Sequence, residues 1–157
     1  MEKVIIGEDD FLLERLTEIA QNSTCVRSKC GSVIYSGGDV IGAGWNSQPN
    51  SLGAHCDCFK DTLGENFKSD KTCCVHAEQR AIMDALKHEP DKLRGSHLFF
   101  IRLDENNLPK RSGKPYCTIC SKMALDVGIA TFSLWQEGGW VSYDTKYYNK
   151  LSFEYNG

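Results

Sequence analysis

The sequence has no apolar run long enough to span a membrane and no excess of basic side chains. Its 157 residues include 18 basic and 21 acidic side chains, which gives a net charge of −3. Because lysine and arginine make most contacts to nucleic-acid phosphates, this balance argues against a polynucleotide partner. A small anion held by one or two local cations is still allowed. Residues 1–10 turn acidic before an apolar segment forms, so we expect no secretory signal and a cytoplasmic protein.

Cysteine is the residue type that the sequence has in excess. Eight cysteines make up about 5% of the chain, below the roughly 8–10% that marks a disulfide-stapled domain. In a reducing compartment such cysteines serve as metal ligands, as catalytic thiols or as core residues. The cysteine count alone does not choose among these roles.

The apolar pattern predicts alternating helices and strands, with no internal repeat or interdomain linker. We expect a single domain over residues 1–157, with helices on both faces of a sheet, which is the α/β class. A polar segment without periodicity forms a cysteine-containing insertion at about 46–74, and loops of that length are usually functional or tied down. The aromatic-rich segment beyond Gly139 is left unassigned, and closing the core is its expected role. The expected helices cover 10–21, 75–87 and 117–127, and the expected strands cover 30–35, 39–45, 98–103 and 129–135.

Two short motifs stand where a loop or strand is expected to lead into a helix. His76 and Glu78 open one helix, and Cys117 and Cys120 open another. One imidazole and two thiolates form a three-ligand zinc set with a fourth tetrahedral position left for water. Helix N-termini lower thiol pKa values and so favour the metal-binding thiolate. The alternative is a buried histidine, a surface glutamate and two core thiols.

These motifs together resemble the zinc-dependent cytidine deaminase superfamily, whose signature is His-x-Glu followed by Pro-Cys-x-x-Cys. Within it the sequence is most similar to the deoxycytidylate (dCMP) deaminase branch, through Ser23–Ile34 and Gly44–Pro49. The resemblance covers roughly residues 9–135. One departure is Tyr116, which separates the proline from Cys117, and another is the long, partly basic loop over 104–113.

The resemblance implies a three-layer α/β/α sandwich with a mixed central sheet of about five strands. It implies hydrolysis of dCMP to dUMP and ammonia by an enzyme that acts on a free nucleotide. In the family, the three donors hold a catalytic Zn²⁺ that acidifies a water, and the glutamate acts as general acid and base. The corresponding residues here are His76, Cys117 and Cys120 as metal ligands, Glu78 as acid and base, and Asn46 and Ala77 as substrate contacts. Arg27 is a further candidate contact because of its charge.

Other readings stay open at this point. The same zinc chemistry could serve cytidine, guanine or another amine-bearing base, and a tRNA adenosine is disfavoured by the acidic balance. A zinc-stabilised binding module without catalysis is disfavoured by Glu78, because a structural site has no need of that carboxylate. Arg27 is either a contact for a 5′-phosphate or a solvated cation, and Lys29 is expected to be solvated. By resemblance we also expect a homo-oligomer, either a dimer or a hexamer.

The remaining cysteines suggest a second, structural metal. Some phage members of the branch use a cysteine at the position of Cys25 and another where Cys56 stands here. Such a site would tie down the polar insertion. The alternative is that Cys30 and Cys74 are core thiols and that the others bind no metal, and core is the expected role of Cys30. The further donors considered for this site are His55, Cys58, Cys73 and Cys74.

Overall fold

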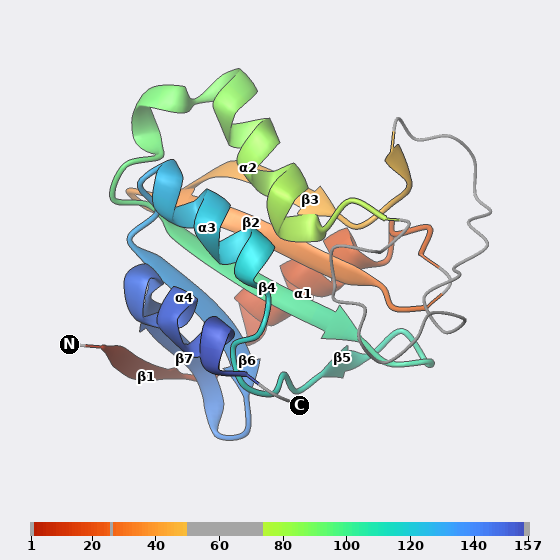
Figure 1. Ribbon diagram of the computed structural model, residues 1–157. Coiled ribbons are helices and arrows are strands. Elements are labelled where there is room, and N and C mark those ends of the chain that lie inside the picture. The colour runs from red at the N-terminus through yellow and green to blue at the C-terminus, as the bar shows by residue number, and fades with distance from the viewer. Residues whose placement is uncertain (1, 26, 50–73, 156–157) are drawn as a thin grey trace.

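The computed structural model describes residues 2–25, 27–49 and 74–155 (Figure 1). Within these ranges the helices are α1 (Asp10–Ala20), α2 (Ala77–His88), α3 (Thr118–Asp126) and α4 (Thr145–Glu154), with a short 3₁₀ turn, η3 (Pro90–Lys92). The strands are β1 (Lys3–Gly7), β2 (Cys30–Ser36), β3 (Asp39–Trp45), β4 (His97–Leu103), β5 (Pro109–Lys110), β6 (Thr131–Gln136) and β7 (Gly139–Asp144). No helix in this part of the chain is both long and apolar enough to cross a bilayer.

All seven strands join one mixed sheet in the order β1-β7-β6-β4-β2-β3, with β5 paired to β4. The β4–β6 pair is parallel, and the other pairs are antiparallel. The predicted α/β class is confirmed, but the predicted count of about five strands is wrong. The count fell short because β5 has two residues, β1 is largely exposed, and β7 lies in the unassigned aromatic segment.

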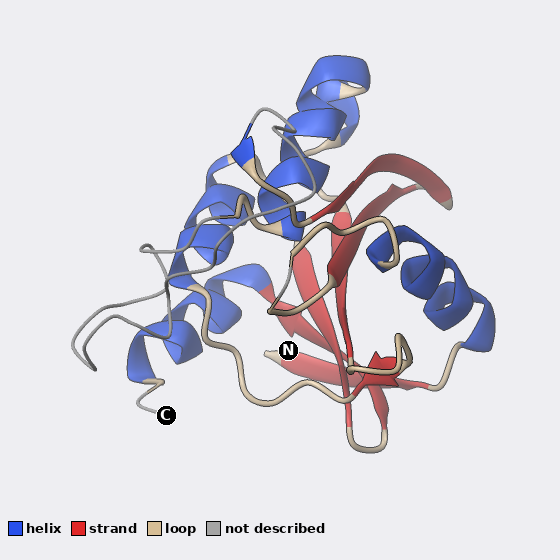
Figure 2. Ribbon diagram, turned by 90° about the vertical axis from the view of Figure 1, so that its right-hand side faces the viewer, coloured by secondary structure: helices blue, strands red, loops and turns tan. Residues whose placement is uncertain are grey.

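Helices cover both faces of the sheet, as the predicted three-layer sandwich requires (Figure 2). On one face α1 packs Leu12, Leu16 and Ala20 against strand residues that include Trp140. The Asp9 carboxylate caps this helix by accepting a hydrogen bond from the Leu12 backbone N–H at 3.0 Å. The other face is covered by α2, α3 and α4. The aromatic segment closes the core, as expected, through the buried side chains of Trp140, Tyr143 and Tyr148.

The contact between α2 and β3 places the start of α2. A Cβ on Gly44 would lie 2.6 Å from the Ala81 backbone nitrogen, so a larger residue has no room there. The Asp84 carboxylate accepts a hydrogen bond from the Ala43 N–H at 2.9 Å, and Ser47 forms a β-bridge with Val75. These contacts fix the start of α2, and with it His76, at one end of the sheet. In Figure 1, α2 and α3 run side by side on the same face.

Candidate metal centre and active site

His76, Cys117 and Cys120 converge where α2 and α3 begin. His76 directly precedes α2, Cys117 directly precedes α3, and Cys120 lies in the first turn of α3. The His76 Nδ1 atom lies 3.3 Å from the Cys117 Sγ atom and 3.2 Å from the Cys120 Sγ atom. The two sulfurs are 3.1 Å apart. Among the described residues, this is the one group of three or more donors able to hold a metal ion.

The geometry and the chemistry of these donors fit zinc. Zn–S and Zn–N bonds of about 2.3 and 2.0 Å at tetrahedral angles separate the donor atoms by about 3.5–3.8 Å. The present separations of 3.1–3.3 Å are slightly shorter, so a small outward movement of the side chains admits the ion. The hydrogen bond between the two sulfurs lowers the pKa of Cys117 to about 5, and burial raises the pKa of Cys120. The pair therefore holds one thiolate ready for a cation.

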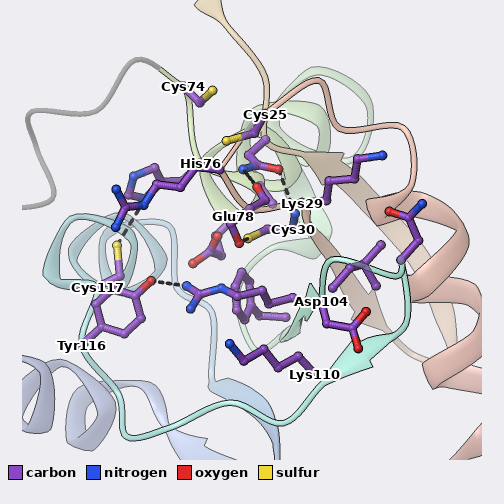
Figure 3. A pocket seen from close by; sticks show the side chains of 18 of the residues that line it. Cys25, Lys29, Cys30, Cys74, His76, Glu78, Asp104, Lys110, Tyr116 and Cys117 are labelled. Atoms are coloured by element: carbon purple, nitrogen blue, oxygen red, sulfur yellow. Dashed lines mark hydrogen bonds between the residues drawn. The ribbon is translucent and has the colours of Figure 1, made fainter. Parts of the chain in front are cut away.

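Glu78 is a buried carboxyl group beside the donor set. It lies in the first turn of α2, it is 5% exposed, and it lines the same pocket as His76 and Cys117 (Figure 3). Burial, and next the negative charge of Cys117, raise the pKa of Glu78 to about 6. A carboxyl group that titrates near neutral pH can both take and give a proton, as a general acid and base must.

The predicted substrate contacts also reach the pocket. Asn46, Ala77 and Arg27 line it, and Arg27 is exposed. The Asn46 Oδ1 atom accepts hydrogen bonds from the Cys30 N–H at 2.8 Å and from the Ser23 hydroxyl at 2.6 Å. The amide therefore organises the segment before β2, and direct contact between Asn46 and a substrate stays a prediction.

The residues predicted for a second metal are divided by the structure. Cys25 and Cys74 line the same end of the pocket (Figure 3). Neither belongs to a group of three or more donors among the described residues. Cys30 is buried, as expected for a core thiol, and burial raises its pKa to about 11. The remaining predicted donors, His55, Cys56, Cys58 and Cys73, lie outside the described residues.

The pocket has a volume of about 880 Å³, within the range typical of small-molecule sites. Among the lining side chains that the sequence did not assign to the site are Arg102 from β4 and Tyr155 after α4, and Tyr116 from the loop before α3 was noted only as a departure from the family signature. The Arg102 Nη2 group donates a hydrogen bond to the Tyr116 hydroxyl, and the rings of Tyr116 and Tyr155 are 5.6 Å apart. One signal could have identified Arg102, because it is a charged residue within an otherwise nearly continuous apolar strand.

The three-layer fold and the His/Cys/Cys donor set define a zinc-binding α/β/α protein. The family model described as "Cytidine and deoxycytidylate deaminase zinc-binding region" matches residues 7–135. The chain belongs to this family, which confirms the resemblance inferred from the motifs.

Two curated relatives are deoxycytidylate deaminases. The protein of Mycobacterium phage D29 is 33% identical over 82 residues, which cover 48% of this chain and 64% of the phage protein. The Schizosaccharomyces pombe protein is 27% identical over 81 residues, which cover 49% of this chain and 25% of the yeast protein. The chain therefore matches less than two thirds of the length of either relative.

Solved structures share the fold at low sequence identity. The dCMP deaminase of cyanophage S-TIM5, in complex with dCMP and dUMP, superposes with a TM-score of 0.57 at 24% identity. That match covers 78% of this chain and 76% of the phage chain. Cytidine deaminase from Burkholderia pseudomallei gives a TM-score of 0.54 at 15% identity, over 88% and 94% of the two chains. At this level of identity the likeness shows the cytidine deaminase-like fold.

Proposed function

We propose that this chain is a zinc-dependent aminohydrolase that converts dCMP to dUMP and ammonia. The observation that carries the proposal is the placement of the buried Glu78 carboxyl group in one pocket with a His/Cys/Cys donor set. The family match and the deoxycytidylate deaminases among its relatives support the substrate. His76, Cys117 and Cys120 would hold the zinc ion, which supplies Lewis acidity that lowers the pKa of a water.

Glu78 would carry out the proton transfers of the reaction. The Glu78 carboxylate would take a proton from the attacking water and deliver it to ring N3 of the cytosine. As the water oxygen bonds to C4, Glu78 would take the second proton from that oxygen and pass it to the amino group, so that the C4–N bond breaks, ammonia leaves and the oxygen becomes the C4 carbonyl of dUMP. Burial of the carboxyl group keeps its pKa near neutral pH, which suits both steps.

The test is ammonia release by the purified, zinc-loaded chain. We expect turnover of dCMP above CMP, deoxycytidine, cytidine, guanine and adenosine. Glu78→Gln should keep its zinc and lose activity by at least about 100-fold, since a general acid–base typically contributes 10²–10⁴-fold. Glu137→Gln, in the exposed turn between β6 and β7, is the matched control and should behave like wild type. A fully active Glu78→Gln enzyme would refute the mechanism, and turnover of a nucleoside or base but not dCMP would refute the substrate.

The other expectations join this proposal. We propose that residues 1–157 form a single deaminase domain with its insertion at about 46–74, and that it works in the cytoplasm as a homo-oligomer. A second, structural zinc would draw on Cys25 and Cys74 and on the donors of the insertion. Two zinc atoms per chain, measured by elemental analysis of metal-saturated and desalted protein, would support that second site. One zinc atom per chain would exclude it.

A further inference from the structure

Arg102 is a cation in an apolar part of the sheet. It stands in β4 opposite Cys30 of β2, and Phe100, on the same face of β4, is part of the apolar core. The guanidinium lines the pocket that also holds Glu78. Among the described residues Arg102 has no ion-pair partner, and its buried Nε atom makes no hydrogen bond. Removing a charge from water is unfavourable unless an opposite charge or hydrogen bonds replace the water.

Tyr116 fixes the position of this guanidinium without neutralising it. The tyrosine hydroxyl accepts a hydrogen bond from Arg102 Nη2, and the Arg102 Cζ atom lies 5.8 Å from the centre of the Tyr116 ring. A tyrosine hydroxyl has an ordinary pKa of about 10 and is uncharged at neutral pH. The contact between the rings of Tyr116 and Tyr155 supports the tyrosine from the other side. The guanidinium also interacts with the Cys30 thiol, and its Nε atom is buried. The donors open to an anion from solution are therefore the terminal N–H groups that Tyr116 and Cys30 do not occupy.

The pocket around Arg102 is rich in cations, although the chain has a net charge of −3. Lys29, Arg27 and Lys110 line it as well, from the segment before β2 and from β5. Arg27 and Lys110 are exposed, so solvent screens their charges, while Arg102 and Lys29 are half-buried. The carboxylates at the pocket are Glu78, Asp104 and Glu105, and none of them forms an ion pair with Arg102 among the described residues.

We propose that Arg102, positioned by Tyr116, binds the 5′-phosphate of the substrate and thereby selects nucleotides over nucleosides. This inference rests on the proposed deamination of a pyrimidine nucleotide. A guanidinium matches a phosphate with two parallel N–H···O bonds, and the half-buried site strengthens them relative to an exposed lysine. Arg102 thus takes the principal role that the sequence alone suggested for Arg27.

The experiment compares dCMP with deoxycytidine in Arg102→Met, which keeps an apolar stem and removes the charge. We expect KM for dCMP to rise and kcat/KM for dCMP to fall by about 10- to 100-fold, the usual range for a lost charge-assisted contact. The value of kcat/KM for deoxycytidine should change by less than about 2-fold. Arg102→Lys should recover part of the loss, because it restores the charge but not the planar pair of donors. Tyr116→Phe should raise KM for dCMP by a smaller factor than Arg102→Met.

Two further variants separate a specific contact from general electrostatics. Lys110→Met removes an exposed cation from the rim of the same pocket and measures the general electrostatic contribution, so it should change the dCMP preference by a smaller factor than Arg102→Met. Lys122→Met, on the exposed side of α3, should change nothing. Zinc content and Tm are measured for each variant to confirm that it folds. An equal loss for both substrates in Arg102→Met, or an equal effect of Lys110→Met, would overturn the assignment.

Binding of the product separates this inference from the proposed function. Calorimetry with dUMP and deoxyuridine needs no turnover, and Arg102→Met should weaken dUMP binding alone. If dCMP is deaminated but the variant keeps the wild-type preference, the role of Arg102 is wrong and the proposed activity stands. If dCMP is not deaminated but dUMP binding depends on Arg102, the activity is wrong and the phosphate contact stands.

Discussion

Gly44→Ala should weaken zinc binding and lower stability, although Gly44 is not a metal ligand, because it disturbs the contact between α2 and β3. A Cβ at Gly44 would lie 2.6 Å from the Ala81 backbone nitrogen, 2.7 Å from the Arg80 Cβ and 2.8 Å from the Ala77 carbonyl oxygen. Ordinary contact begins near 3.4 Å, so the first turns of α2 must move away by about 0.8 Å. Because two of the three atoms belong to the helix backbone, no side-chain rotation relieves the overlap.

The expected cost follows from this displacement. Overpacking of a close backbone contact costs about 1–3 kcal/mol of unfolding free energy, which lowers Tm by about 3–10 °C in a domain of this size. The residue before α2 is His76, so its Nδ1 atom moves relative to the two sulfurs of α3. Loss of the contacts that orient a metal ligand typically costs 10- to 100-fold in metal affinity, and we expect the zinc dissociation constant to rise by about that factor.

The assay combines thermal unfolding, a zinc titration with a competing chelator, and dCMP turnover at limiting and saturating zinc. Gly113→Ala is the matched control, since nothing lies within 4 Å of the Cβ that it adds and its backbone angles suit alanine. It should keep wild-type Tm and zinc affinity. If Gly44→Ala matches the control in Tm and zinc affinity, the close α2–β3 contact does not position His76, and this reasoning is refuted.

Two more predictions concern a metal ligand, Cys120, and the contact of Glu8 with Arg111 in the loop before α3. Cys120→Ser should lower bound zinc, measured by elemental analysis, to well below one atom per site and abolish turnover, whereas Ser142→Ala on β7 should change neither. Glu8 accepts hydrogen bonds from the Trp135 indole and from Arg111. Both lower the pKa of Glu8, and the bond from Trp135 has the larger effect. The stability contributed by Glu8 is thus fully present above the unfolded pKa of about 4.5 and is lost as pH falls through the lower folded pKa. Glu8→Gln should therefore lower Tm at pH 7 and converge with wild type in strong acid, and a constant difference across that range would contradict it.

The sequence was sufficient for the parts of the fold that have strong local signals. Three helices were predicted from apolar residues at helical spacing, the strand pair over 30–45 from its Gly37-Gly38 turn, and the buried strand near 98–103 from its nearly continuous apolar run. The strand β1 was missed because Val4, Ile5 and Ile6 are all at least 42% exposed and show no alternation. The strand β7 and the helix α4 were missed because both lie in the aromatic-rich segment beyond Gly139, whose apolar residues show no clear repeat of either element.

The same contrast holds within the site. The donors His76, Cys117 and Cys120 could be predicted because each belongs to a short motif at the start of a helix. Such a motif can be recognised from the sequence without knowing the tertiary fold. The wall made by Arg102, Tyr116 and Tyr155 could not, because its members are 14 and 39 residues apart and meet only in the folded chain. Sequence patterns identify chemistry that one element carries, and they miss contacts that several elements share.

This division has a consequence for substrate choice. The donor set and Glu78 are carried by the starts of α2 and α3, which core packing against the sheet holds in place. The facing wall comes from the end of β4, the loop before α3 and the residue after α4. Tyr116 stands where the family signature has its proline, and it is the residue that holds the Arg102 guanidinium. The side of the pocket that faces the phosphate can therefore change while the metal donors are kept. The substrate specificity of this chain must be measured on this chain rather than transferred from its relatives.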